Sequence, residues 1–281
     1  MAEASFAHAA DALRRGDRDR YLSTLVLTGL HRDAVTALYA FNADVASIRE
    51  RVSDPAPGEI RLQWWSDALD GEGHGAVRQN PVADALLDTM ARYTIPAGTL
   101  LRLIGARRFD LYDDPMPDLE TFEGYAGETV STLYQLAAMI LNDGETIETG
   151  DAAGHLGVAH AMIGHLRAFG LVSAQGRIML PWSVFEANGV REEEIFARTE
   201  SDGLSEALGQ IAELATAHLD KAEIAIAALP GRLKPAFASI AVLKAQLAAL
   251  NRRQTSLFAP VPDDADWRKI ARLAWWTWRN R

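Results

Sequence analysis

Apolar residues recur along this chain with the spacing of an α-helix, and no segment shows the strict alternation of a half-buried strand. Between positions 32 and 51 one stripe of apolar positions consists of Ala34, Leu38, Phe41, Val45 and Ile48. This i, i+4, i+7 rhythm places one apolar stripe on a helix face, and such a face is normally buried against other helices. The pattern therefore predicts an all-α helical bundle.

The same periodicity, interrupted by proline and glycine, predicts a series of helices. Their expected ranges are 17–30, 32–51, 60–69, 81–93, 97–111, 119–141, 151–169, 203–228, 233–251 and 267–279. Positions 54–58, with two prolines, are expected to break the chain, and 172–188 is expected to be a loop with short turns. No repeat or low-complexity linker interrupts the 281 residues, so we expect a single domain spanning 1–281.

Charge and composition exclude several classes of function. A net charge of −10 argues against a general nucleic-acid surface, so no nucleic-acid partner is expected. The absence of cysteine excludes disulfides, thiolate metal sites and cysteine nucleophiles. The segment from Met1 to Arg20 lacks the apolar run of a secretory signal, and no segment approaches the roughly 20 apolar residues of a membrane span. These features predict a cytoplasmic protein whose membrane contact would be peripheral, at the inner face.

Four short segments, in collinear order, carry a family resemblance. They are Leu38-Tyr39-Ala40-Phe41-Asn42, Tyr125 to Leu133, Leu156-Gly157-Val158-Ala159 continuing to Arg167, and Gly176-Arg177-Ile178-Met179-Leu180-Pro181. In this order and spacing they resemble the motifs of squalene and phytoene synthases, over roughly Tyr21 to Val190. The resemblance implies the isoprenoid-synthase fold, an all-α bundle around a central cavity.

Members of that family join two prenyl diphosphates head to head, and magnesium holds the diphosphate that leaves. Magnesium takes carboxylate and water oxygens, and carboxylates at i and i+4 share one helix face. The first aspartate-rich motif of the family falls on positions 46–50, where only Glu50 is a carboxylate. The glutamine, asparagine and two aspartates of the second helix fall on Ala161, Gly164, Ala168 and Val172. The resemblance therefore implies no metal site, no catalytic residue and no cofactor, with Mg²⁺ expected only if a reduced prenyltransferase site persists.

Some residues remain as candidates for lining the cavity or binding an anion: Tyr39, Glu50, Asp110, Arg167 and Arg177. Arginine suits bidentate contact with phosphate, but Arg167 and Arg177 could equally form structural salt bridges. For Glu50, pairing with a neighbouring arginine is the simpler interpretation, and for Asp110, pairing with Arg107 or Arg108.

The emptied positions also predict the character of the cavity. Its expected lining is Ala43, Ala46, Ala161, Gly164 and Ala168. The space should then be an apolar cavity or be collapsed by neighbouring side chains. An apolar cavity would suit a prenyl tail or a quinone-like lipid.

The departures from the synthase motifs themselves form a pattern. They are Ala40-Phe41-Asn42, Val52-Ser53 followed by Arg61, Gln63 and Trp65, and Tyr125-Ala126 followed by Ser131. This pattern resembles the non-catalytic branch of the family typified by the assembly factor of mitochondrial respiratory complex I. It implies a scaffold or lipid-binding role in assembly, with complex I subunits or assembly intermediates as partners. A head-to-head prenyl diphosphate synthase and a peripheral membrane adaptor remain as alternatives.

The C-terminal segment, residues 267–281, is rich in tryptophan and arginine. It contains Trp267, Trp275, Trp276 and Trp278, with five basic side chains and no acidic one. On a helix, the apolar stripe would be Trp267, Ile270, Ala271, Ala274 and Trp278. Such an amphipathic helix suits a membrane interface or a groove on a partner. The alternative is that it closes the bundle, with its tryptophans in the core.

Overall fold

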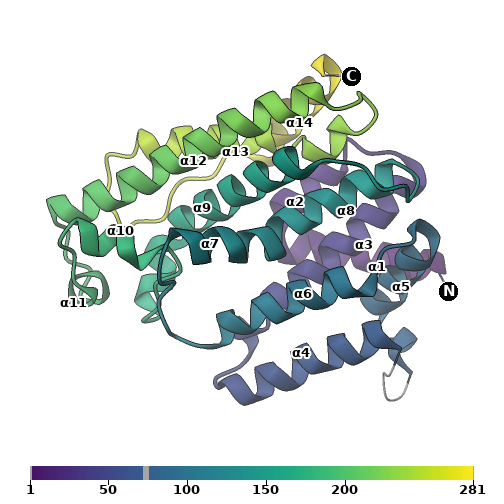
Figure 1. Cartoon of the computed structure of the whole chain (residues 1–281), viewed down its shortest axis with the longest axis horizontal. Helices are drawn as coiled ribbons and strands as arrows, with labels where there is room; N and C mark the ends of the chain where they lie inside the picture. Colours follow the sequence, from purple (N-terminus) through teal and green to yellow (C-terminus); the bar gives the residue numbers. More distant parts are fainter. Residues whose placement is uncertain (1, 72–75, 281) are drawn as a thin grey trace.

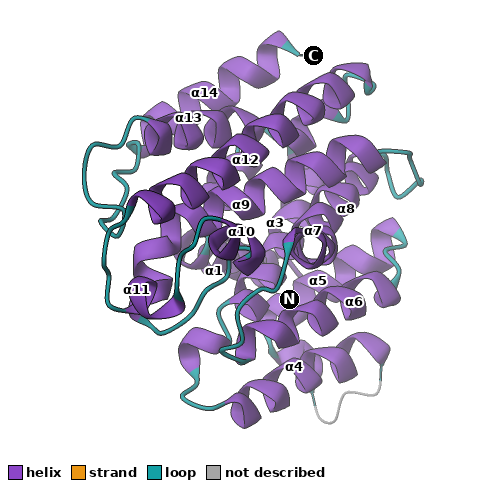
Figure 2. Ribbon diagram, turned by 60° about the vertical axis from the view of Figure 1, so that its left-hand side comes forward, coloured by secondary structure: helices purple, strands orange, loops and turns teal. Residues whose placement is uncertain are grey.

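A computed structural model describes residues 2–71 and 76–280, and it confirms the all-α prediction: the elements in this part of the chain are helical (Figures 1 and 2). The α-helices are α1 (Ala2–Gly16), α2 (Arg18–Thr24), α3 (Gly29–Ala46), α4 (Pro55–Asp70), α5 (Pro81–Tyr93), α6 (Ala97–Arg107), α7 (Leu119–Ala126), α8 (Thr132–Leu141), α9 (Gly150–Ala174), α10 (Trp182–Ala187), α11 (Glu192–Phe196), α12 (Asp202–Ala228), α13 (Ile240–Asn251) and α14 (Asp266–Arg279). Short 3₁₀ turns are η1 (Arg49–Arg51), η2 (Val77–Gln79), η3 (Arg108–Leu111) and η5 (Lys234–Phe237), and η4 (Gly127–Ser131) is a π-helix between α7 and α8.

The start of the chain differs from the prediction. Helix α1 was not expected, and the predicted helix over 17–30 is interrupted between α2 and α3. Asp17 begins α2 by accepting a hydrogen bond from the Arg20 backbone N–H (3.0 Å), as N-cap residues do. Gly29, where α3 begins, has a φ of 56°, a left-handed conformation that glycine adopts without strain.

Two expected breaks are also corrected. The break expected at 54–58 lies earlier, at 52–54, because Pro55 is already the first residue of α4, where its missing N–H needs no partner. Helix α9 continues through 172 to Ala174, and the predicted loop beyond it contains α10. Arg281, the last residue of the predicted C-terminal segment, lies outside the described residues.

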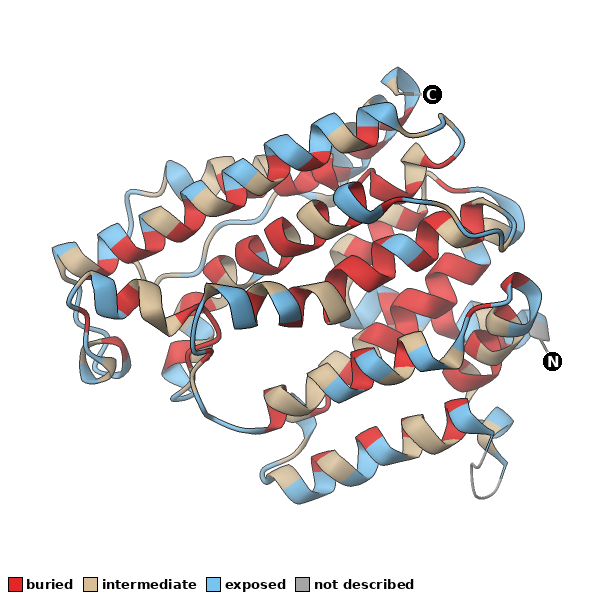
Figure 3. Cartoon of the chain, in the orientation of Figure 1, coloured by how far each residue is buried: buried red, intermediate tan, exposed pale blue. Residues whose placement is uncertain are grey.

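Helix α9 forms the centre of the bundle. It packs along α12 and also contacts α7, α8, α13 and η4, and Figure 1 shows it running between them. Its buried residues lie on every side of the helix, from Ala152 to Ser173, as a central helix requires. Buried positions likewise concentrate on the inward faces of α3 and α8 (Figure 3). The stripe expected on α3 is part of this core.

Helix α14 lies at the edge of the bundle, beside α2 and α13, and presents an unexpected face to it (Figure 2). Its buried residues are Lys269, Leu273 and Thr277. The predicted apolar stripe is exposed instead, so the interpretation that the tryptophans close the core is wrong for Trp267, Trp275 and Trp278. Trp276 alone of the four is half-buried and packs against the core.

No helix within 2–71 and 76–280 combines the length and the apolarity needed to cross a bilayer.

Candidate functional site: a cavity between α3 and α9

A cavity of about 310 Å³ lies between α3 and α9, with further walls from α2, α6, α7 and the loop after α9. Four of the five small residues expected to line it do so: Ala46, Ala161, Gly164 and Ala168. Ala43 does not, because it faces α1, where Gly16 approaches it closely. Asn42 and Val172 lie in the wall as well.

The wall is also strongly charged, which corrects the expectation of an apolar or collapsed space. The charged side chains that line it are Arg20, Arg49, Arg107, Arg177, Asp17, Glu50 and Asp110. Of these, Arg20, Arg49, Arg107 and Asp17 were not among the predicted candidates. They come from α2, η1 and α6, and no spacing within any one segment indicates that these segments converge.

Asp110 and two neighbours form a buried polar cluster in the cavity wall. The Tyr125 hydroxyl donates to Asp110 Oδ1 (2.6 Å), and Arg107 Nη1 donates to Asp110 Oδ2 (3.0 Å) and to the Tyr125 oxygen (2.7 Å). Burial raises the pKa of the Tyr125 hydroxyl well above its usual range, so this group stays a neutral donor. The predicted pairing of Asp110 with Arg107 is confirmed, while Arg108 pairs with Glu59.

Asp113 joins two of the cavity arginines at the rim. Its Oδ1 accepts from Arg49 Nη2 (3.0 Å) and lies 3.7 Å from Arg177 Nε. Arg177 Nη2 also donates to the carbonyl oxygen of Asp110 (3.1 Å). Among the described residues, the buried Nε atoms of Arg49, Arg107 and Arg177 have no hydrogen-bond partner. A buried N–H group without a hydrogen bond is energetically costly, so binding of a ligand oxygen that accepts from it would be favourable.

Glu50 lies exposed at the edge of the cavity. Among the described residues Glu50 has no ion-pair partner, so its predicted pairing with a neighbouring arginine is wrong. Arg49 pairs with Asp113 instead, and Arg51 pairs with Asp44. Asp44 points away from the cavity and also accepts a hydrogen bond from the Trp65 indole (2.8 Å). Over residues 2–71 and 76–280, no group of three or more histidine or carboxylate side chains is placed to hold a metal ion.

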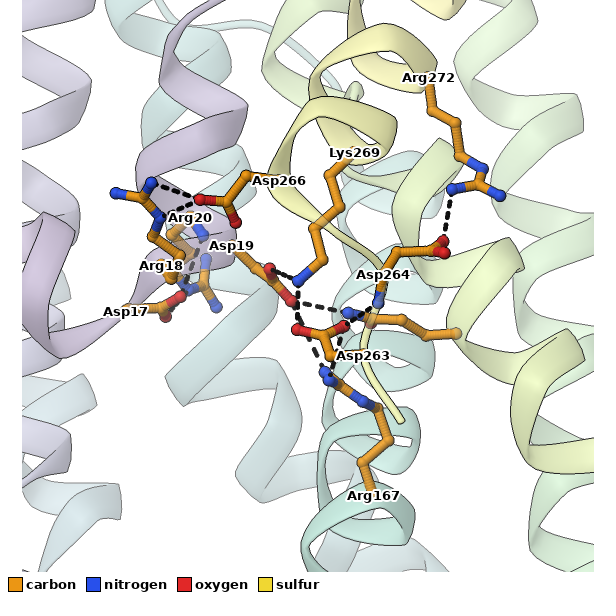
Figure 4. A network of polar contacts seen from close by, with 11 residues as sticks. Asp17, Arg18, Asp19, Arg20, Arg167, Asp263, Asp264, Asp266, Lys269 and Arg272 are labelled. Carbon is orange, nitrogen blue, oxygen red and sulfur yellow. Dashed lines mark hydrogen bonds and ion pairs between the residues drawn. The ribbon is translucent and has the colours of Figure 1, made fainter. Parts of the chain in front are cut away.

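The other two candidates, Tyr39 and Arg167, line an adjoining cavity of about 140 Å³. The guanidinium of Arg20, which reaches both cavities, lies 5.1 Å from the Tyr39 ring centroid. Arg167 is held by carboxylates of two other segments, at 3.6 Å from Asp19 and 3.1 Å from Asp263 (Figure 4). Its guanidinium thus takes part in a salt-bridge network that ties α9 to α2 and to the loop before α14.

His160 and His165, both on α9, complete the polar wall. His160 Nδ1 lies 2.8 Å from the Tyr134 hydroxyl, and the His165 ring packs against Phe122. Burial lowers the pKa of His165 to about 4, and lowers that of His160 as well.

These histidines predict a loss of stability in mild acid. The unfolded chain binds a proton at His165 with a pKa of about 6.5, and the folded chain only near 4, so stability is complete above pH 6.5 and falls as the pH drops towards 4. His165 alone should lower the free energy of unfolding by about 2 kcal/mol between pH 7 and pH 5. Urea denaturation at several pH values measures this change. His165→Gln should flatten the profile, and His8→Gln, on the exposed side of α1, should leave it unchanged. A wild-type profile in His165→Gln would contradict the assignment.

An all-α bundle around a cavity walled by α3 and α9 defines a protein of the isoprenoid-synthase type. A crystal structure of a dehydrosqualene synthase in complex with ligand has this fold, with a TM-score of 0.83, 18% identity and coverage of 99% of this chain and 97% of that one. The sequence matches the squalene/phytoene synthase family model over residues 13–276, and the chain belongs to that family.

Two relatives represent different activities within the family. NADH dehydrogenase (ubiquinone) complex I, assembly factor 6, from Bos taurus is 28% identical over 250 residues, covering 89% of this chain and 75% of the relative. Phytoene synthase 1, chloroplastic, from Arabidopsis thaliana is 26% identical over 230 residues, covering 78% of this chain and 53% of the relative. The match to the assembly factor is therefore longer on both chains.

Proposed function

We propose that this protein is a non-catalytic member of the family that acts in the assembly of respiratory complex I. The observation that carries the proposal is the presence of Ala46, Ala168 and Val172 on the cavity wall, where the family motifs place metal-binding aspartates. Magnesium requires several oxygen ligands, and Glu50 alone cannot supply them. The similarity to assembly factor 6 supports the role in assembly, with subunits or intermediates of complex I as partners.

Within this role, the cavity is proposed to hold an isoprenoid or quinone-like lipid without a metal ion. The small residues Ala161, Gly164 and Ala168 leave room for an apolar tail. The guanidinium groups of Arg49 and Arg177, whose Nε–H groups donate no hydrogen bond among the described residues, suit the oxygen atoms of a head group.

Deletion of the gene in its own organism tests the assembly role. We expect NADH dehydrogenase activity of the membranes to fall, because complex I would not assemble, while squalene and carotenoid contents stay unchanged. Complementation with the wild-type gene should restore the activity. Normal NADH dehydrogenase activity in the deletion strain, or loss of an isoprenoid product, would overturn the proposal.

The purified protein should also fail to turn over prenyl diphosphates. With farnesyl or geranylgeranyl diphosphate and Mg²⁺, we expect no diphosphate release above a protein-free control, because the carboxylates that would hold the metal ions are absent. Steady release of diphosphate together with a joined product would contradict the prediction.

The second candidate function is a prenyl diphosphate synthase with a reduced metal site. The position of Glu50 at the cavity edge, near four arginines that could neutralise a diphosphate, favours it. This function predicts turnover that is abolished by Glu50→Ala and kept by Glu148→Ala, which changes an exposed carboxylate before α9. Absence of turnover in the wild-type protein would count against it.

A further inference from the structure

Three of the five exposed aromatic side chains in the described part of the chain lie on the outward face of α14. Trp267, Trp275 and Trp278 are 66%, 61% and 66% exposed, and Ile270 beside them is 39% exposed. Trp275 and Trp278 pack on each other with ring centroids 5.0 Å apart. Large apolar side chains gathered in this way on a surface usually mark a site of interaction.

The helix is fixed in this orientation by ion pairs on its inner side. Lys269, almost fully buried, contacts Asp19 Oδ1 (2.6 Å) and also pairs with Asp263 (Figure 4). Asp266 pairs with Arg18 of α2, and Arg272 pairs with Asp264. Turning the tryptophans inward would break these contacts and leave Lys269 without its carboxylates. The fold therefore keeps the apolar face of α14 exposed on the surface of the protein.

The charges beside this face are basic. Arg268 and Arg279 are exposed beside the tryptophans. The Arg268 guanidinium lies 5.3 Å from the Trp267 ring centroid, and its Nη1 lies 3.7 Å from Asp264 Oδ1. The nearby carboxylates Asp263, Asp264 and Asp266 lie at the N-terminal end, and all of them pair with basic side chains. This face is therefore basic, although the chain as a whole carries a net charge of −10.

We propose that α14 docks this protein on the surface of a bilayer that contains anionic lipids. Trp267, Trp275 and Trp278 would enter the interfacial region, where tryptophan is favoured, and the neighbouring arginines would contact lipid head groups. The position of α14 along the edge of the bundle lets its whole length lie flat on such a surface (Figure 2). Anionic lipid is preferred over a protein groove because the two charged side chains exposed beside the tryptophans of α14, Arg268 and Arg279, are both basic. This inference goes beyond the proposed function and does not depend on it.

Co-sedimentation with vesicles tests the docking. The full-length protein should bind vesicles of phosphatidylcholine and phosphatidylglycerol, and bind vesicles of phosphatidylcholine alone more weakly. Added salt should weaken the binding, because the attraction to the anionic surface is screened. Replacing both arginines, as Arg268→Gln with Arg279→Gln, should reduce partitioning by about fivefold for each.

The triple variant Trp267→Ser, Trp275→Ser, Trp278→Ser should lose at least about tenfold in partitioning, because most of the interfacial apolar area is removed. Its matched control is Ile60→Ser, Leu171→Ser, Ile224→Ser, which removes side chains of 71%, 65% and 74% exposure from other helices. The control should bind as the wild type does. Circular dichroism and thermal unfolding verify that both variants are folded.

Three outcomes would overturn the docking. They are a wild-type protein that does not bind anionic vesicles, a tryptophan variant that binds as well as the wild type, and a control variant that loses as much binding as the tryptophan variant. Loss of a protein partner by the tryptophan variant, without vesicle binding by the wild type, would assign α14 to a protein groove instead.

Discussion

Replacing Asp110 with alanine is expected to lower the free energy of unfolding by about 3–5 kcal/mol, because it leaves the Arg107 guanidinium buried without its carboxylate. The side chains of Arg107 and Asp110 are only 13% and 12% exposed, so water would replace the lost partner only in part. The Tyr125 hydroxyl would lose its acceptor at the same time. Urea denaturation at neutral pH measures the loss.

Three further variants separate the buried charge from other effects. Asp110→Asn keeps an oxygen acceptor for Tyr125 and should cost less than alanine. Adding Arg107→Met to Asp110→Ala should recover much of the stability, since no uncompensated charge remains. Asp113→Ala, which removes a side chain of 61% exposure, should cost less than about 1 kcal/mol. Equal losses from Asp110→Ala and Asp113→Ala would show that burial of the pair does not determine the cost.

Much of the fold could be predicted from the sequence because its signals are local. The stripe on α3 is buried as expected, with both Leu38 and Phe41 at 0% exposure. Helix α5 begins and ends at the predicted residues, since Asn80 caps it and Pro81 occupies its first position. The collinear motifs then fix which helices pair around the cavity, and the small residues of α9 follow from them.

The charged part of the cavity could not be predicted in the same way. Arg20 and Arg107 lie far apart in the sequence, and each belongs to a segment whose periodicity describes only its own helix. Arg177 was expected at the cavity only because its loop resembles a family motif. Their convergence depends on the packing of α2, α6 and the loop after α9. Among the charged residues that were not predicted, Arg49 had a usable signal, because it lies within the aligned aspartate-rich motif at the cavity.

The orientation of α14 was open for a different reason. Amphipathicity identifies an apolar stripe, but whether that stripe faces the bundle depends on which side chains of the bundle lie opposite the helix. Here the residues opposite α14 include Asp19 of α2 and Asp263 of the preceding loop, and Lys269 forms ion pairs with both on the inner side of the helix. The ion pairs that join α14 to α2 and to the loop before α14 thus outweigh the usual preference for burying the apolar side of a helix.

Gly157 is required by a close contact between helices. An added Cβ would lie 2.1 Å from Ser131 Oγ and 2.5 Å from Ser131 Cα and N, in the π-helix η4. The Ser131 hydroxyl also donates to the Gly154 carbonyl oxygen of α9 (3.1 Å). The conflict is partly with backbone atoms, which cannot rotate away as a side chain can. The Leu-Gly-x-Ala pattern at 156–159 is thus explained by helix packing rather than by chemistry at the cavity.

Gly157→Ala is therefore expected to destabilise the protein by about 3 kcal/mol or more, because α9 must move away from η4 to make room for the methyl group. Gly154→Ala is the matched control, since it lies one turn earlier on the same helix and its Cβ would meet nothing within 4 Å. That variant should be more stable than the wild type by about 0.5–1 kcal/mol, because alanine favours the helix over glycine. Chemical denaturation of the two variants side by side measures the difference. Similar stabilities would mean that α9 and η4 can separate at little cost, and the cavity wall on α9 would then be more adaptable than its packing indicates.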